Sequence, residues 1–325
     1  MTPARFFLEL AETILAGQEP SRSEYLRLAE LPDTEVIHLL PAADRLRDGF
    51  CGRRIHLCTI LNAKSGNCTE DCAFCSQSRR SHSATPCYPL KSGHEMEAAA
   101  RKAASTPIHR FSLVTSGKGP TPSEVEKICA AASGPKKERL GFCASLGILD
   151  REQLKRLKDA GFSRYHHNLE TAESFFPSIC TSHTWEERAA TVREAKAAGF
   201  SVCCGGLFGL GESDRQRLEL ALELKKLSVD AVPINFLAPI SGTPLEGASF
   251  LTPWRCLKII ALFRFVLPDR EILICGGREH NLRSLHPLVF TAGASGIMTG
   301  NYLTTEGRQL KDDLEMLRDL GFQPR

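Results

Sequence analysis

The sequence predicts an α/β protein, a (β/α)8 barrel of the TIM type with an N-terminal helical extension. Short apolar, β-branched runs alternate with helical patterns from about residue 54 onward, which is typical of a parallel sheet covered by helices. Eight such pairs can be counted over about 250 residues, a length that suits an eight-stranded barrel. We therefore expect the helical extension over residues 1–50 and the barrel over residues 51–325.

The order of the expected elements follows from hydrophobic pattern and from helix start and stop signals. Thr121, Asp150 and Thr184 stand where helices would begin, and Gly161 and Gly199 where helices would end. The last two strands have the weakest pattern, so an incomplete barrel with a separately folded end remains an alternative. Strands are expected at 55–61, 110–116, 140–146, 164–170, 201–209, 231–237, 271–277 and 295–300, and helices near 95–105, 121–132, 150–160, 185–198, 213–226, 252–266, 283–291 and 306–320.

Composition excludes several classes of protein. The chain is 42% hydrophobic and 24% charged with a net charge of +3, and it has no basic run that would indicate nucleic-acid binding. Its longest apolar stretches, such as residues 259–263, are far shorter than the roughly 20 residues of a membrane span. Glu9 and Glu12 interrupt the apolar N-terminus, which favours an amphipathic helix over a signal peptide. We expect a cytoplasmic protein that binds neither nucleic acid nor membrane.

The 13 cysteines are the unusual feature of the composition. A disulfide framework is not expected in a chain of this size without a signal peptide, and clustered cysteines in a reducing compartment favour metal or iron–sulfur ligation. Free cysteine is also among the most buried residue types. We interpret Cys51, Cys87, Cys129 and Cys256 as packed core thiols.

Cys68, Cys72 and Cys75 form a C-x3-C-x2-C motif in the segment NAKSGNCTEDCAFCSQS, and the next cysteine is Cys87. The motif follows the first expected strand, so it belongs to the face of the barrel where active sites gather. Three thiolates can hold three irons of a 4Fe–4S cluster and leave the fourth iron open. Zinc with a distant fourth ligand is the weaker alternative, because this is not a usual zinc-knuckle spacing.

This motif is that of the radical S-adenosylmethionine enzymes, and the chain resembles biotin synthases along roughly residues 50–305. The motifs RYHHNLET, VCCGGLFGLGE, VPINFL followed by GTPLE, and AGASGIMTGNYL occur in matching order. The resemblance implies that residues 51–325 form a radical S-adenosylmethionine barrel whose C-terminal part is the biotin- and thiamin-synthesis-associated region.

The resemblance also implies an activity. Electron transfer to the cluster cleaves S-adenosylmethionine, and the 5′-deoxyadenosyl radical takes hydrogen from two unactivated carbons of dethiobiotin. Sulfur from an auxiliary iron–sulfur cluster then closes the ring of biotin. The implied partners are dethiobiotin, a reducing flavodoxin or ferredoxin, the iron–sulfur assembly machinery and a second copy of the chain in a homodimer.

Several site residues are carried over from the family by position. Phe74 matches the aromatic residue beside the adenine, Asn168 and Glu170 match the polar pair that contacts the ribose and the substrate, and Arg188 matches an arginine facing the methionine carboxylate. Glu170 is usually aspartate in the family. Taken singly, Asn168 could satisfy a strand end and Arg188 could be a solvated helix residue, but the ordered match of the motifs favours function.

Two further positions concern the substrate. Asn235 matches a contact to the ureido group, with the satisfaction of a strand end as its structural alternative. His166 occupies a place where asparagine often stands, so recognition of the ureido group is expected to differ in detail.

The auxiliary cluster is where the sequence departs from the family. Well-known biotin synthases hold a 2Fe–2S cluster with three cysteines and an arginine. Here Cys143 and Cys203 match two of the cysteines, but Ser112 stands at the position of the first cysteine and Leu273 at that of the arginine.

Strand alternation suggests replacements, because residues i and i+2 share a face. Cys275 lies two residues beyond Leu273, Arg110 lies two before Ser112, and Cys58 lies on the first strand. We predict that one cavity is lined by four cysteines that hold a four-iron auxiliary cluster, with Arg110 offsetting its charge, as in some biotin synthases of anaerobes. Cys58 and Cys275 are alternatively core thiols, Cys204 is expected in the core, and Cys180 is a reserve ligand. The four predicted ligands are Cys58, Cys143, Cys203 and Cys275.

Two other functions remain as alternatives. One is a different radical S-adenosylmethionine enzyme of the same branch, similar to hydrogenase maturases or methylornithine synthases. The other is a non-catalytic iron–sulfur or zinc protein used for electron transfer or binding, against which the missing fourth local ligand argues.

Overall fold

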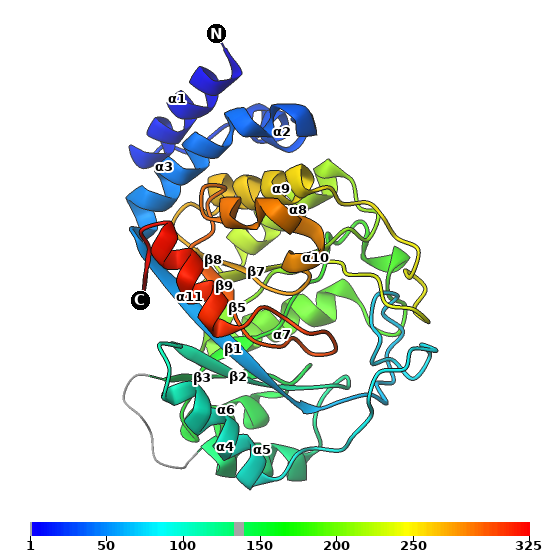
Figure 1. The fold of residues 1–325 in the computed structure, drawn as a ribbon. Helices are drawn as coiled ribbons and strands as arrows, with labels where there is room; N and C mark the ends of the chain where they lie inside the picture. Colours follow the sequence, from blue (N-terminus) through cyan, green and yellow to red (C-terminus); the bar gives the residue numbers. More distant parts are fainter. Residues whose placement is uncertain (1, 133–139) are drawn as a thin grey trace.

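A computed structural model describes residues 2–132 and 140–325 and shows a closed parallel barrel surrounded by helices (Figure 1). Neighbouring strands pair in parallel around the barrel, and the last strand pairs with the first through His56 and Gly296. This closure confirms the expected barrel, and the incomplete barrel is wrong. The barrel strands are β1 (Arg54–Lys64), β2 (Arg110–Thr115), β3 (Gly141–Ser145), β4 (Phe162–His166), β5 (Ser201–Cys203), β6 (Gly206–Phe208), β7 (Ala231–Phe236), β8 (Glu271–Ile274) and β9 (Gly296–Met298).

The fifth barrel position is interrupted, because β5 and β6 are two short strands where one was expected. Glycine at the break allows the backbones to approach. A Cβ on Gly205 would lie 2.0 Å from the carbonyl oxygen of Pro233, and one on Gly206 would lie 2.5 Å from that of Glu170. The strand expected at 164–170 also ends earlier, at His166, and Glu170 turns with φ +68°.

The outer helices begin where local signals place them. The side chains of Asp150 and Thr184 accept hydrogen bonds from backbone N–H groups at N3 and form capping boxes, as do those of Ser92 and Ser213. The single helix expected at 283–291 is instead a short α-helix followed by the 3-10 helix η3 (Arg283–Val289). The outer helices are α4 (Gly93–Ala104), α5 (Pro122–Ala132), α6 (Arg151–Asp159), α7 (Trp185–Ala197), α8 (Asp214–Lys226), α9 (Pro253–Val266), α10 (Arg278–Leu282) and α11 (Leu310–Asp319).

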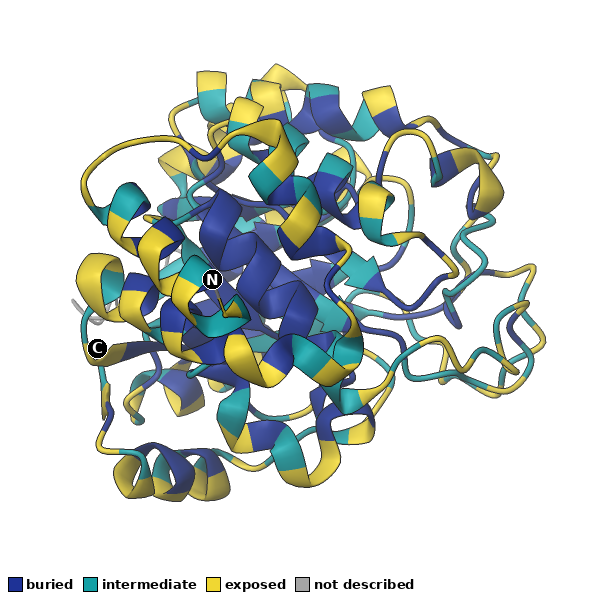
Figure 2. Ribbon diagram, turned by 90° about the horizontal axis from the view of Figure 1, so that it is seen from above, coloured by how far each residue is buried: buried dark blue, intermediate teal, exposed yellow. Residues whose placement is uncertain are grey.

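The N-terminal extension covers one side of the barrel beside α8 and α9 (Figure 1). Its apolar faces continue the main core, which explains why α9 is buried almost all round (Figure 2). Lys258 of α9 is 3% exposed and donates hydrogen bonds to the carbonyl oxygen of Leu31 and to Asp214. Separation of the extension and the barrel into two domains stays a prediction. The extension consists of α1 (Pro3–Leu15), α2 (Arg22–Ala29), the 3-10 helix η1 (Asp33–His38) and α3 (Leu40–Cys51).

The end of the chain returns to the start of the barrel. The short strand β10 (Gln323–Pro324) pairs in parallel with β1, so that Arg54 lies opposite Gln323. Within the described ranges, the chain contains no helix with the length and apolar character needed to cross a membrane.

Candidate functional site

The three cysteines of the motif lie on the loop that follows β1, at the carboxyl end of the strands. The N–H of Cys75 donates to the carbonyl oxygen of Cys72 and the N–H of Cys68 to that of Gln77, each at 3.0 Å, which holds the loop in tight turns. All three cysteines line one cavity of about 210 Å³. Three soft thiol ligands on one wall of an open cavity fit a cluster that keeps a vacant iron.

A polar cradle faces this loop across the cavity. The Arg188 guanidinium donates to the carbonyl oxygen of Asn168 at 2.6 Å and to the carboxylate of Glu170 at 2.9 Å, and Asn168 Nδ2 lies 3.4 Å from the same carboxylate. Burial raises the pKa of Glu170, while the charge of Arg188 opposes that shift. The structure thus brings together the three polar residues that the resemblance assigned to S-adenosylmethionine, and Phe74 lines the same cavity.

A second cavity of about 300 Å³ lies inside the barrel and continues from the first. Phe74, His166, Asn168 and Glu170 line both cavities, so a ligand bound against the cluster loop would meet a molecule held in the barrel. This arrangement of adjoining cavities suits two small molecules that react with one another.

The four cysteines expected on inward faces line this second cavity. Cys143, Cys203 and Cys275 are buried and Cys58 is partly exposed. Burial raises the pKa of Cys203 to about 12 against the pull of Arg164, and Nη1 of Arg110 lies 3.9 Å from Cys143 Sγ. The four thiols share one cavity as predicted, and their role as ligands stays a prediction.

The cavity also contains an unsatisfied polar group at the position where the family has a cysteine. The hydroxyl of Ser112 is buried without a hydrogen-bond partner among the described residues. Buried hydroxyls are normally bonded, so Ser112 faces a space that suits a polar or inorganic group. Leu273, at the family's arginine position, lines the cavity and packs against Cys203 and Cys275.

The remaining cysteines do not all behave as expected. Cys204 is fully buried outside the cavity linings, and Cys256 is buried in α9. Cys87 is exposed, so its interpretation as a packed core thiol is wrong, because the loop that carries it runs over the surface. Cys180 lies 3.7 Å from Cys72 Sγ on the cluster-loop side, which removes it from the candidate auxiliary ligands.

Asn235 and His166 lie at the cavity wall with different properties. The Asn235 amide donates to the carbonyl oxygen of Gly206 at 3.2 Å and accepts from the N–H of Gly276 at 3.0 Å, so it also satisfies strand ends. Burial and the charges of Arg188 and Arg164 lower the pKa of His166 to about 4. His166 is therefore neutral near pH 7 and can both donate and accept a hydrogen bond.

Sequence reasoning missed a charged group in the barrel cavity. Arg164 on β4 is 5% exposed and donates to Glu271 at 2.7 Å and to the hydroxyl of Ser201 at 3.0 Å. Its positive charge also interacts electrostatically with Cys143 and Cys203. Strand alternation could have revealed it, because Arg164 is two residues before His166 and shares its inward face.

The mouth of the cavity was also missed. Residues 302–305, on the loop between β9 and α11, line the cavity. The buried Arg278 holds this loop by donating to the hydroxyl of Tyr302 at 2.9 Å, and its charge is paired with Asp313 at 2.6 Å. The two partners are 35 residues apart in the chain, so no local pattern indicates this pairing.

Comparisons with known proteins agree with this geometry. Residues 63–224 match the radical SAM superfamily, and residues 233–323 match the biotin and thiamin synthesis associated domain. The biotin synthase of Desulfatibacillum aliphaticivorans is 55% identical over 315 residues, covering 97% of this chain and 96% of that protein. The biotin synthase of Geobacter sulfurreducens is 50% identical over 318 residues, covering 97% of each.

Solved structures support the fold. A methylornithine synthase superposes with a TM-score of 0.83 at 23% identity over 97% of both chains. The FeFe-hydrogenase maturase from Carboxydothermus hydrogenoformans superposes with a TM-score of 0.78 at 21% identity, covering 99% of this chain and 80% of that one. At these identities the likeness shows the barrel alone. The near full-length identity to biotin synthases is more specific, and it shows that this chain belongs to the biotin synthase family of radical S-adenosylmethionine enzymes.

Proposed function

We propose that the protein converts dethiobiotin to biotin by radical S-adenosylmethionine chemistry. The observation that carries this proposal is the pair of adjoining cavities, one lined by the three-cysteine loop and the other by four cysteines that lie in or directly after four different strands. Membership of the biotin synthase family gives the reaction, and the cavities supply separate places for the radical source and the sulfur source.

The chain's own residues bind and orient the reactants. Cys68, Cys72 and Cys75 would hold the first cluster, while Arg188 would pair with the methionine carboxylate and Glu170 would accept from the ribose hydroxyls. When bound, the cofactors supply a radical strong enough to take hydrogen from unactivated carbon, together with the sulfur that is inserted. The protein contributes position, and the largely apolar lining of the barrel cavity disfavours water beside the reacting groups.

Substrate recognition falls to polar groups that line the barrel cavity. Asn168, Asn235 and the neutral His166 offer amide and imidazole groups that can bond a ureido group in the barrel cavity. Asn235 already bonds Gly206 and Gly276, which fixes its orientation and leaves spare acceptor capacity on its oxygen.

The auxiliary site fits a four-iron cluster better than a two-iron cluster with an arginine ligand. Four cysteines line its cavity, whereas Leu273 cannot act as the missing ligand. Arg110 and Arg164 stand nearby as cations that offset the anionic sulfurs. Buried thiols with raised pKa values must lose protons to bind iron, so two neighbouring cations favour loading of this site.

Iron and sulfide analysis with Mössbauer spectra on anaerobically reconstituted protein tests this proposal. Two four-iron clusters predict about eight irons per chain, all in four-iron environments. About four irons would leave the barrel cysteines as core thiols and remove the sulfur source. A two-iron spectrum in addition to that of the first cluster would show that the auxiliary site holds the 2Fe–2S cluster usual in the family.

Product analysis separates this function from its alternatives. Incubation with dethiobiotin, S-adenosylmethionine and a reductant should give biotin. Cleavage of S-adenosylmethionine without biotin would favour another enzyme of the same branch. An unchanged spectrum of the reduced cluster on addition of S-adenosylmethionine would favour a non-catalytic iron–sulfur protein. We further propose a reduced flavodoxin or ferredoxin as electron donor, loading by the iron–sulfur assembly machinery, a homodimer and a cytoplasmic location.

A further inference from the structure

A set of hydrogen bonds that the proposed function does not use joins the cluster loop to the segment that leads into α7. Asp71 lies between Cys68 and Cys72, and its Oδ1 accepts from the N–H groups of Thr181 and Ser182 at 2.9 and 3.0 Å. In return, the N–H of Asp71 donates to the hydroxyl of Ser182 at 3.1 Å. We call these contacts of Asp71 with Thr181 and Ser182 the Asp71 clamp.

Further contacts reinforce the clamp on both sides. The hydroxyl of Thr181 donates to Oδ2 of Asp71 at 2.5 Å, and Arg80 donates to the same oxygen at 3.1 Å. Two residues further along the loop, the N–H of Ala73 donates to the carbonyl oxygen of Ile179 at 2.8 Å. Hydrogen bonds to an ionised acceptor are stronger than those between neutral groups, so the Asp71 carboxylate is the main fastening between the two segments.

The neighbouring Glu70 reaches the same segment. Its Oε2 accepts from the hydroxyl of Ser182 at 2.8 Å and lies 2.7 Å from Nδ1 of His183. The other ring nitrogen of His183 lies 3.0 Å from Nη1 of Arg188, which is the donor because a guanidinium has no acceptor. A continuous chain of polar contacts therefore runs from the cluster loop to the guanidinium of Arg188.

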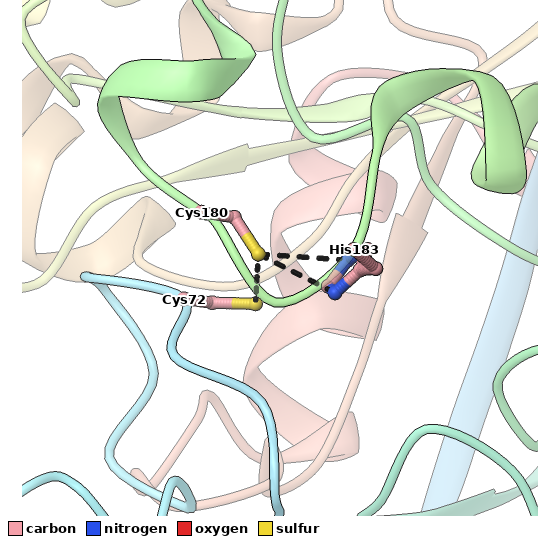
Figure 3. A group of neighbouring side chains, drawn as sticks. All are labelled: Cys72, Cys180 and His183. Carbon is pink, nitrogen blue, oxygen red and sulfur yellow. Dashed lines mark hydrogen bonds between the residues drawn. The ribbon is translucent and has the colours of Figure 1, made fainter.

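Figure 3 shows how closely the two segments meet. Cys180 and His183, on the segment that leads into α7, face Cys72 on the cluster loop. The donor atoms of these three residues lie within 4.8 Å of one another. Because Cys72 belongs to the cluster motif, we assign no separate metal ion to this group. The contact instead fixes the segment against the loop.

The clamp bears on Arg188 because of its place in the chain. Arg188 lies in the first turn of α7, and the N-cap of that helix, Thr184, follows Ser182 by two residues. The clamp therefore fixes the backbone from which Arg188 extends, while Asn168 and Glu170 hold its guanidinium from the β4 side. A molecule that contacts both the open iron and Arg188 needs these groups held within about 0.5 Å of their productive separation.

We propose that Asp71 positions Arg188 relative to the three-cysteine loop and thereby sets the affinity for S-adenosylmethionine. The inference rests on the proposed function, in which the loop holds the first cluster and Arg188 pairs with the methionine carboxylate. Asp71 lines neither cavity, so it acts through the backbone of Thr181 and Ser182. It is a positioning residue rather than a catalytic residue.

The first test is equilibrium binding of S-adenosylmethionine to the full-length, anaerobically reconstituted protein. Asp71→Ala removes every side-chain contact of the clamp and should weaken binding about tenfold at equal iron content, because a displaced Arg188 loses part of a charge-assisted hydrogen bond. Asp71→Asn keeps one acceptor oxygen and should lie between Asp71→Ala and the parent. At saturating S-adenosylmethionine, its cleavage rate and the KM for dethiobiotin should equal those of the parent.

The matched control is Asp230→Asn. The carboxylate of Asp230 also accepts a backbone N–H, that of Val202 at 2.7 Å, but it lies directly before β7, at the amino end of the strands. Parent affinity for S-adenosylmethionine is expected in this variant. Equal affinities in the parent and Asp71→Ala, at equal iron content, would overturn the inference.

Ser182→Ala opens the clamp from the α7 side and leaves the cluster loop unchanged. It removes the hydroxyl that accepts from the N–H of Asp71 and donates to Glu70, so it should weaken binding by less than Asp71→Ala does. Loss of iron from the Asp71 variants, together with parent affinity in Ser182→Ala, would overturn the inference, since the clamp would then shape only the cluster loop.

Amide hydrogen exchange of the iron-free protein gives a readout that needs no cluster. Asp71→Ala should speed exchange in peptides that cover residues 179–188, because the N–H groups of Thr181 and Ser182 lose their acceptor, and Asp230→Asn should not. Unchanged exchange in Asp71→Ala would also overturn the inference. The proposed function fails on a different observation, a parent cluster that does not respond to S-adenosylmethionine.

Discussion

Replacement of Cys275 by alanine tests whether the barrel cysteines hold iron or only fill space. Cys275 is 4% exposed, and Cys256 in α9, which does not line the cavity, is 0% exposed. Each substitution removes one buried sulfur, so each should lower the free energy of unfolding of the iron-free protein by about 1 kcal/mol. If four irons occupy the auxiliary site, Cys275→Ala should lose about half of roughly eight irons per chain, and Cys256→Ala should lose none.

The assay measures iron, acid-labile sulfide and two products on the same anaerobic samples. Cys275→Ala should abolish biotin formation and keep measurable cleavage of S-adenosylmethionine, since the proposed ligands of the first cluster line a cavity that Cys275 does not reach. Cys58→Ala should behave in the same way. Equal iron contents in the parent and Cys275→Ala, with normal biotin formation, would refute the four-cysteine site and leave Cys275 a packed thiol.

Three further predictions follow from the charges around the cavities. Burial would raise the pKa of Glu271, but hydrogen bonding by His56 and the charge of Arg164 outweigh burial and lower it. The ionised Glu271 therefore stabilises the folded protein fully above the pKa of an unfolded glutamate, about 4.3. This contribution to the free energy of unfolding is lost as the pH falls through the lower pKa of the folded state. Glu271→Gln should therefore flatten the acid limb of the stability profile of the iron-free protein, as measured by urea unfolding; an unchanged limb would contradict this. Arg164→Met removes the buried partner of Glu271, which keeps its more exposed partner Arg325, so the free energy of unfolding should fall by about 2 kcal/mol. The same substitution should reduce iron loading of the auxiliary site. Asp313→Asn weakens a fully buried ion pair with Arg278 and should lower the free energy of unfolding by about 3 kcal/mol. It should also raise the KM for dethiobiotin, because Arg278 anchors the loop at the mouth of the cavity through Tyr302. A wild-type KM would show that this anchor does not contribute to substrate binding.

Much of the architecture is determined by local sequence. The alternation of strand and helix patterns predicts the barrel, and capping residues such as Asp150 and Thr184 begin helices because their side chains satisfy exposed N–H groups nearby in the chain. The three-cysteine loop is also local, since its three cysteines lie within eight residues. Strand alternation is equally local, and it placed Cys143, Cys203 and Cys275 on the inward face.

Local patterns predicted the remaining elements less well. The expected helix at 283–291 became a short helix and a 3-10 helix, and the fifth strand broke in two. At that break, the contact of Gly205 with Pro233 decides the path of the backbone. Such contacts join residues on neighbouring strands, so the hydrophobic periodicity of one segment cannot predict them.

The sequence by itself determined the barrel, the cluster loop and the inward face of each strand, because these depend on spacing along a single segment. Only the tertiary structure decided which segments meet. It brought Cys180 to Cys72, 108 residues away, and joined Arg164 to Glu271, 107 residues away. Partner choice at such separations depends on strand register and on the packing of the whole barrel, and no single segment of the sequence contains either of them.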